Sequence, residues 1–177
     1  MYVYIMEIPS FEGGWSYTQR EMTELFKHIT YSKNYSILEF GSGNSTLKIY
    51  NHFKKHVENL ILYSYESNSD YLQRHDEIKF ILYDEDDIPN TSIPDMKFDL
   101  ILIDGPNGYK RSLWYSKIRS NIKHGTVLLV DDFNHYQCFS DELDKNFKYE
   151  VLSFHDEPFV AYGEHSWKIV KILDIIN

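Results

Sequence analysis

Five short and almost continuously apolar runs recur along this chain, with polar or helix-like segments between them. The runs cover residues 36–40, 60–66, 78–84, 98–104 and 126–132. Apolar runs of this length predict strands that are buried on both faces, which is typical of parallel sheets. The segments between them are long enough for right-handed crossovers. The pattern therefore predicts an α/β fold with a Rossmann-like, doubly wound and mostly parallel sheet.

Helical periodicity marks the connecting segments, and the end of the chain changes pattern. We expect helices within residues 16–30, 46–56, 67–75, 112–122 and 138–147. The segments 149–154 and 166–173 predict a closing pair of antiparallel strands. The chain has 177 residues and no internal repeat or linker, so we expect one domain spanning residues 1–177.

Charge and composition exclude several classes of function. The net charge of -9 disfavours charge-driven contact with nucleic acid or with anionic membranes. The one cysteine, Cys138, permits no intrachain disulfide and no cysteine-based zinc site. The N-terminal residues lack the pattern of a secretory signal, and no stretch reaches membrane-spanning length. We expect a soluble, cytoplasmic protein, and its oligomeric state stays open, a homodimer included.

Every one of the five predicted strands carries a carboxylate at or next to its end. In open α/β sheets, ligands bind beyond the carboxyl ends of the strands. The sequence therefore predicts a functional site at this edge of the sheet. The acidic residues in question are Glu39, Glu66, Asp84, Asp104, Asp131 and Asp132.

A glycine turn, Gly41-Ser42-Gly43, follows the first predicted strand. Glycines at such a turn let a ligand approach the backbone closely, because no Cβ intervenes. A dinucleotide fingerprint would require a third glycine where Thr46 stands, which disfavours a nicotinamide-dependent oxidoreductase. A plain tight turn remains the alternative, but Glu66 follows at about the spacing at which an acidic residue reaches a ribose.

These features together resemble the class I S-adenosylmethionine-dependent methyltransferases. The resemblance rests on E-F-G-S-G at residues 39–43, on the later acidic strand ends and on the closing antiparallel pair. It implies that Glu39 orients the methionine part of the cofactor, which passes over the glycine turn. It also implies that Glu66 holds the ribose and that Asp84 lies beside the adenine. The cofactor-binding residues implied are Glu39, Gly41, Ser42, Gly43, Glu66, Asp84 and Asp104.

Three aspartates end the fourth and fifth predicted strands, which should be neighbours in the sheet. Asp104, Asp131 and Asp132 would then lie close together, and like charges at short distance are mutually unfavourable. Some of them are protonated, or they diverge, or a cation lies among them. Oxygen ligands of this kind suit Mg²⁺ or another hard divalent cation. The alternative for Asp131 and Asp132 is capping of the following helix.

The motifs I-D-G at residues 103–105 and V-D-D at 130–132 are similar to those of the metal-dependent, macrocin-type sugar O-methyltransferases. D-G-P-N-G-Y at residues 104–109 also resembles the plant polysaccharide glucuronate O-methyltransferases. The resemblance implies that Asp104, Asp131 and Asp132 bind the metal. It further implies a hydroxyl of a sugar, nucleotide sugar or glycan as methyl acceptor. This chain is shorter than many members, so the sugar and the hydroxyl are not indicated.

A mechanism follows from these parts. A bound divalent cation would lower the pKa of the acceptor hydroxyl, and a nearby base would take its proton. Asp104 and His135 are the candidate catalytic residues for this step. Lys110 and Arg111 suit an anionic group of the acceptor, or form an exposed basic helix start. The alternatives are a metal-independent methyltransferase acting on a nitrogen or carboxylate, and a non-catalytic binding module with this fold.

Overall fold

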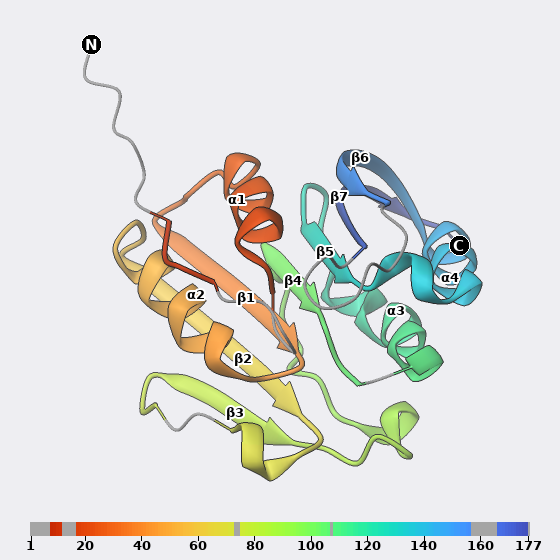
Figure 1. Ribbon diagram of the computed structural model, residues 1–177, viewed down its shortest axis with the longest axis horizontal. Helices are drawn as coiled ribbons and strands as arrows, with labels where there is room; N and C mark the ends of the chain where they lie inside the picture. Colours follow the sequence, from red (N-terminus) through yellow and green to blue (C-terminus); the bar gives the residue numbers. More distant parts are fainter. Residues whose placement is uncertain (1–7, 12–16, 73–74, 107, 157–165, 177) are drawn as a thin grey trace.

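The computed structural model describes residues 8–11, 17–72, 75–106, 108–156 and 166–176. It contains a seven-stranded sheet with the order β3-β2-β1-β4-β5-β7-β6 (Figure 1). Strands β1 to β5 run parallel, and β7 lies antiparallel between β5 and β6. This order confirms the predicted Rossmann-like sheet with its closing antiparallel pair. The strands are β1 (Asn34–Phe40), β2 (Asn59–Glu66), β3 (Ile78–Leu82), β4 (Leu100–Ile103), β5 (Val127–Asp131), β6 (Phe147–His155) and β7 (Trp167–Ile175).

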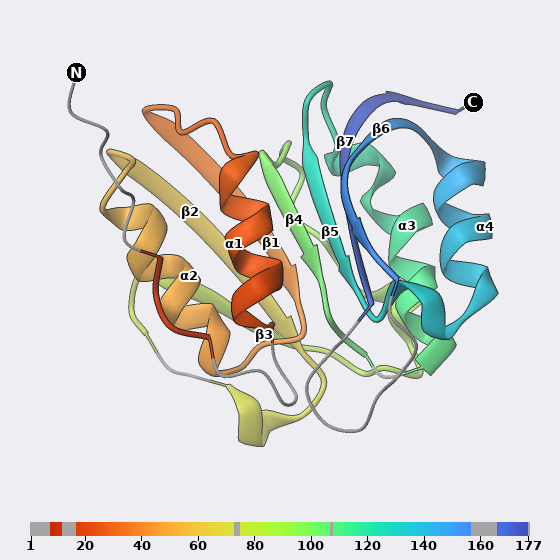
Figure 2. The same ribbon diagram turned by 45° about the horizontal axis from the view of Figure 1, so that its top comes forward.

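Helices cover both faces of the sheet, as a doubly wound fold requires (Figure 2). Helices α1 (Gln19–Lys27) and α2 (Asn44–Lys54) lie on one face. Helices α3 (Leu113–Lys117) and α4 (Gln137–Asn146) lie on the other. None of the helices in the described residues is long and apolar enough to cross a membrane.

Two predicted elements are shorter than the sequence pattern suggested. Of the helix expected over residues 67–75, the described part forms only a 3₁₀ turn at Ser69–Tyr71. The side chain of Asn68 accepts a hydrogen bond from the backbone N–H of Asp70 there, which competes with helix continuation. Strand β3 ends at Leu82, two residues earlier than expected, so Asp84 lies beyond the ladder rather than at its last position.

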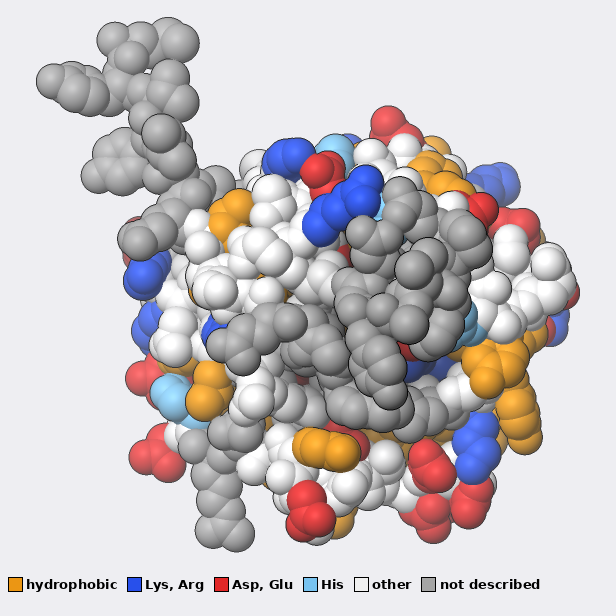
Figure 3. Space-filling view, in the orientation of Figure 1, with side chains coloured by type: hydrophobic (Ala, Val, Ile, Leu, Met, Phe, Trp, Pro, Cys, Tyr) orange, Lys and Arg blue, Asp and Glu red, His pale blue; other side chains and the backbone are white. Residues whose placement is uncertain are grey.

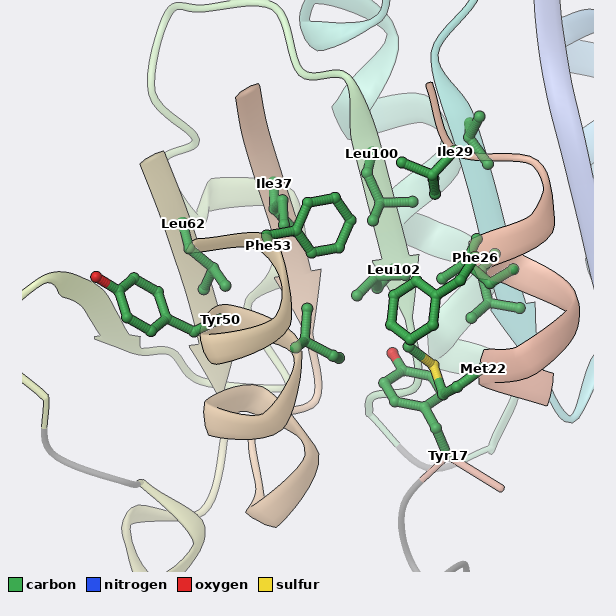
Figure 4. Close-up of a cluster of buried hydrophobic side chains, with 14 of the residues drawn as sticks. Tyr17, Met22, Phe26, Ile29, Ile37, Tyr50, Phe53, Leu62, Leu100 and Leu102 are labelled. Atoms are coloured by element: carbon green, nitrogen blue, oxygen red, sulfur yellow. The ribbon is translucent and has the colours of Figure 1, made fainter. Parts of the chain in front are cut away.

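Each face of the sheet has its own hydrophobic core. Helix α1 contributes Met22 and Phe26 to the first core, and α2 contributes Phe53. Figure 4 shows these side chains pointing toward residues of β1, β2 and β4. In the second core, the ring of Trp114 stacks on that of Phe40 at 3.8 Å between centroids. Because side chains of one strand point alternately to the two faces, both cores use the same parallel strands.

Strands β1 and β4 end in a close backbone contact between two glycines. Gly41 has a φ of +100°, and a Cβ on it would lie 2.7 Å from the backbone nitrogen of Gly105. The N–H groups of Asp104 and Gly105 both donate to the carbonyl of Phe40 at 2.8 Å. Only glycine fits at position 41, and this contact fixes the spacing of the two strand ends.

The two glycines of the first turn therefore provide a matched pair of variants. We expect Gly41→Ala to lower the free energy of unfolding by roughly 2–4 kcal/mol, because it combines backbone strain with a collision. Gly43 has an extended φ of 177°, and no atom of the described residues lies within 4 Å of the place that a Cβ would take, so Gly43→Ala should cost less than about 1 kcal/mol. Urea unfolding followed by tryptophan fluorescence measures both. Equal losses in the two variants would contradict the close contact.

Candidate functional site

The acidic residues that we predicted to form a site lie at or just beyond the carboxyl ends of the parallel strands. Phe40 of β1 is level with Ile103 of β4, and Ile103 is level with Val130 of β5. The next residues of β4 and β5 are Asp104 and Asp131, so these two acidic residues leave neighbouring strands at the same height. The register thus brings together the strand ends from which a ligand site could be built.

Glu39 is buried in β1, and one of its two carboxyl oxygens accepts hydrogen bonds. Its Oε2 accepts hydrogen bonds from the hydroxyls of Thr46 at 2.8 Å and Ser64 at 2.6 Å. Its Oε1 is buried and has no hydrogen-bond partner in the described part of the chain. Burial raises the pKa of Glu39 to about 8, although the two hydroxyls oppose the shift. A cationic group beside Oε1 would supply the missing partner.

Thr46, which stands where a dinucleotide fingerprint has glycine, connects Glu39 to the glycine turn. Its Oγ1 accepts a hydrogen bond from the N–H of Gly43 at 3.0 Å while it donates to Glu39. The neighbouring Ser42 is buried, and its N–H donates to Oε2 of Glu66 at 2.8 Å. The turn is therefore held from both sides by acidic residues of β1 and β2.

Glu66, at the end of β2, has a carboxylate whose orientation is fixed by backbone N–H groups. Besides the bond from Ser42, its Oε1 accepts from the N–H groups of Ser67 and Asn68, both at 2.8 Å. Asp84 is exposed, and its Oδ1 accepts from the N–H of Asp86 at 2.9 Å. Glu66 is thus a rigid part of the site, whereas Asp84 lies at its solvent-exposed border.

The three aspartates of β4 and β5 converge, and the cation among them is the guanidinium of Arg111. Its Nη2 lies 3.7 Å from Oδ1 of Asp104, and its Nη1 lies 3.9 Å from Oδ2 of Asp131 and 3.5 Å from Oδ2 of Asp132. Arg111 is buried, and its N–H groups also donate to the carbonyls of Pro106 at 3.2 Å and Asp131 at 2.7 Å. The neighbouring carboxylates keep its pKa raised despite burial.

The arrangement does not fit the Mg²⁺ that the sequence suggested. Within the described residues, no group of three or more acidic, histidine or cysteine side chains could hold a metal ion. A divalent cation among these aspartates would lie next to the guanidinium, and two cations repel at such distances. The expectation that Arg111 faces an anionic ligand or solvent also differs from the structure, since Arg111 is buried against carboxylates. Lys110 pairs with Asp86 instead.

Two residues of α1 and its N-cap region belong to this cluster, and the sequence analysis did not identify them. Glu21 is fully buried, and burial followed by the charge of Asp104 raises its pKa well above the usual value. Tyr17 is also fully buried, and burial followed by the charge of Asp104 raises its pKa. Glu21 precedes Leu25 by four residues and so shares the apolar face of the helix. That acidic residue on an apolar face was the signal available in the sequence.

Asp132 and His135 lie at the exposed side of the cluster. Asp132 adopts the left-handed conformation with a φ of 54°, which is uncommon for a residue other than glycine. The Nδ1 atom of His135 lies 3.6 Å from Oδ1 of Asp132, and the imidazole is exposed. The structure thus brings His135 to the border of the site, while its role as a base stays a prediction.

Comparison with known proteins shows the fold of this chain. A scan of protein-family models gives no match, and a search of curated proteins gives no significant match. An rRNA methylase from Streptococcus thermophilus has a TM-score of 0.59 and 9% identity, over 86% of this chain and 95% of that chain. The N-methyltransferase NodS from Bradyrhizobium japonicum, in complex with S-adenosyl-L-homocysteine, has a TM-score of 0.58 and 12% identity, over 88% of this chain and 87% of that chain. The chain therefore has the fold of the class I S-adenosylmethionine-dependent methyltransferases.

Proposed function

We propose that the protein is an S-adenosylmethionine-dependent methyltransferase. The observation that carries the proposal is the buried Glu39, whose Oε1 atom has no partner in the described residues and lies beside a glycine turn at the end of β1. S-adenosylmethionine bears an ammonium group that could pair with this oxygen. The cofactor supplies a methyl group already activated on a sulfonium, so the protein has mainly to position the acceptor.

Further residues at this edge fit the rest of the cofactor. In the part of the chain that the structure describes, no atom lies within 4 Å of where a Cβ at position 43 would stand, so the backbone leaves room above the turn. Glu66 is held rigid by three backbone N–H groups, and its two oxygens retain capacity to accept ribose hydroxyls. Asp84 lies at the exposed end of this path, on the side we assign to the adenine.

The acceptor would lie toward the ends of β4 and β5. Our sequence-based hypothesis was metal-dependent O-methylation of a sugar, and the site gives no support for its Mg²⁺. We therefore propose methyl transfer without a bound divalent cation, with Arg111 holding the aspartates in place. Asp104 remains the proposed catalytic base, because it is the partly exposed carboxylate at the end of β4. Mg²⁺-dependent sugar methylation becomes the alternative that the first experiment tests.

A small acceptor suits this protein better than RNA, although some of its structural neighbours are described as rRNA methylases. The net charge is -9, and the strand ends that form the site are acidic. Basic and acidic side chains of the described residues are interspersed on the face shown in Figure 3. Because RNA binding draws on clustered lysine and arginine, these features favour a small molecule.

Titration calorimetry with S-adenosylhomocysteine tests the proposal directly. We expect micromolar binding that is the same in EDTA and in Mg²⁺, and at least about tenfold weaker in Glu66→Gln, since hydrogen bonds to a charged group contribute about 1.5–3 kcal/mol. Glu58→Gln is the matched control, because Glu58 precedes the same strand at its opposite end and pairs with Lys33 on the surface. Absence of binding would refute the methyltransferase proposal. Binding or turnover that requires Mg²⁺ would restore the metal-dependent alternative.

Glu39 gives a second prediction, which concerns stability against pH. Because folding raises its pKa from about 4.5 to about 8, the stability it contributes is present at low pH and is lost as the pH rises toward 8. Glu39→Gln removes this dependence and keeps an oxygen for Thr46 and Ser64. Between pH 5.5 and pH 8, the unfolding free energy of the variant should rise by on the order of 3 kcal/mol relative to that of the unmodified protein.

Urea unfolding of both proteins at the two pH values measures this shift, and the same variant should bind S-adenosylhomocysteine at least about tenfold more weakly. Parallel pH dependence of the two proteins would show that Glu39 is ionised in the folded state, contrary to our assignment.

A further inference from the structure

Three buried groups near Arg111 each have a polar atom that the described residues leave without a hydrogen-bond partner. They are Oε1 of Glu21, Oδ1 of Asp131 and the hydroxyl of Tyr17. Glu21 and Tyr17 are 0% exposed and Asp131 is 4% exposed. Buried polar groups in folded proteins are nearly always hydrogen-bonded, so three unpartnered atoms among the residues around one guanidinium require an explanation.

The second carboxyl oxygens of Glu21 and Asp131 already interact with other groups of the protein. Oε2 of Glu21 accepts the N–H of Thr18 at 3.2 Å and completes the capping box of α1. Oδ2 of Asp131 lies 3.9 Å from Nη1 of Arg111. The unpartnered oxygens are therefore the remaining acceptors of side chains whose positions are otherwise fixed.

The three groups lie close enough to influence one another. After burial, Glu21 is the largest contributor to the raised pKa of Asp131, followed by Asp104. Burial raises the pKa of Tyr17, followed by the charges of Asp104 and Glu39 and then by those of Glu21 and Asp131. Four carboxyl groups, from Glu21, Asp104, Asp131 and Asp132, lie around one guanidinium, so they outnumber the cations of the cluster.

We propose that the methyl acceptor carries a protonated amine, and that Glu21, Asp131 and the hydroxyl of Tyr17 form the subsite that binds it. This inference rests on the proposed methyltransferase function and names its substrate class. An ammonium group presents three N–H donors and a positive charge, which match three unpartnered oxygens in an acidic surrounding. A neutral hydroxyl offers a single donor and no charge.

The subsite lies apart from Glu39, to which we assign the amino acid end of the cofactor. Glu39 lies in β1, whereas Asp131 ends β5, and β4 lies between these two strands. Neighbouring strands are about 4.8 Å apart, so the ends of β1 and β5 are about 10 Å apart. One ammonium group cannot serve both places. The cofactor's amino acid end is assigned to Glu39, and the second acidic place is left for the acceptor.

Matched pairs of small probes test the subsite. Glucosamine and glucose differ by one amine, as do ethanolamine and ethylene glycol. With S-adenosylhomocysteine present at saturation, chemical-shift titration of the labelled protein gives the affinity for each probe. We expect each amine to bind at least about tenfold more tightly than its hydroxyl counterpart, which corresponds to about 1.4 kcal/mol. Equal affinities within both pairs would overturn the proposal.

Two variants and a control assign the effect to these residues. Glu21→Gln keeps the capping box, which glutamine also forms, and Asp131→Asn keeps the shape of the side chain. Each should weaken amine binding at least about tenfold and leave hydroxyl probes unchanged. Glu24→Gln is the control, because Glu24 lies on the same helix but pairs with Lys27 at the surface. Unchanged amine affinity in both site variants would overturn the proposal.

Failure of this inference and failure of the proposed function give different results. S-adenosylhomocysteine that binds while amines do not would refute the amine subsite alone. Amines that bind while S-adenosylhomocysteine does not would refute the methyltransferase assignment and support the subsite. If Glu21→Gln and Asp131→Asn weakened S-adenosylhomocysteine but not the amines, these carboxylates would belong to the cofactor and the proposal would be overturned.

Discussion

The buried guanidinium of Arg111 is the interaction on which the site depends. It lies within 4 Å of three carboxylates that leave the ends of β4 and β5, and it also binds the carbonyl groups of Pro106 and Asp131. Removing one member of a buried ionic network leaves the other charges uncompensated, which is far more costly than losing a surface ion pair. Arg111 therefore fixes the geometry of the acidic edge and is the cation that lies among its three aspartates.

The side of the site that we propose for the cofactor is fixed differently, by hydroxyl and backbone groups. Thr46 and Ser64 hold Oε2 of Glu39, and Thr46 also accepts the N–H of Gly43. The contact between Gly41 and Gly105 sets the distance from this turn to the end of β4. The glycine turn and the aspartate cluster thus share one rigid backbone contact, which couples the stability of the fold to the geometry of both halves.

The sheet and its acidic edge could be predicted from the sequence, because buried parallel strands and glycine turns have recognisable local sequence patterns. The neighbouring positions of β4 and β5 in the sheet, and the closeness of their aspartates, followed from that fold. The pairing of Arg111 did not, because a basic residue after a glycine turn is locally typical of a solvent-exposed helix start. Glu21 and Tyr17 were missed because their burial arises from packing of α1 on the sheet, although the position of Glu21 on the apolar face of that helix was a signal in the sequence. The helix expected over residues 67–75 failed because Asn68 satisfies the backbone locally.

The carboxylates at this edge divide into two kinds, those whose oxygens the backbone holds and those that we propose bind a ligand. Both oxygens of Glu66 accept backbone N–H groups, so its orientation is set before any ligand arrives. Glu39, Glu21 and Asp131 are equally buried, yet each keeps an oxygen that the described residues do not satisfy. Folding has to offset the cost of such atoms, which is about 1–3 kcal/mol each. Three such oxygens at one edge of the sheet lower the stability of the unliganded protein, and a cationic ligand bound there would offset that loss.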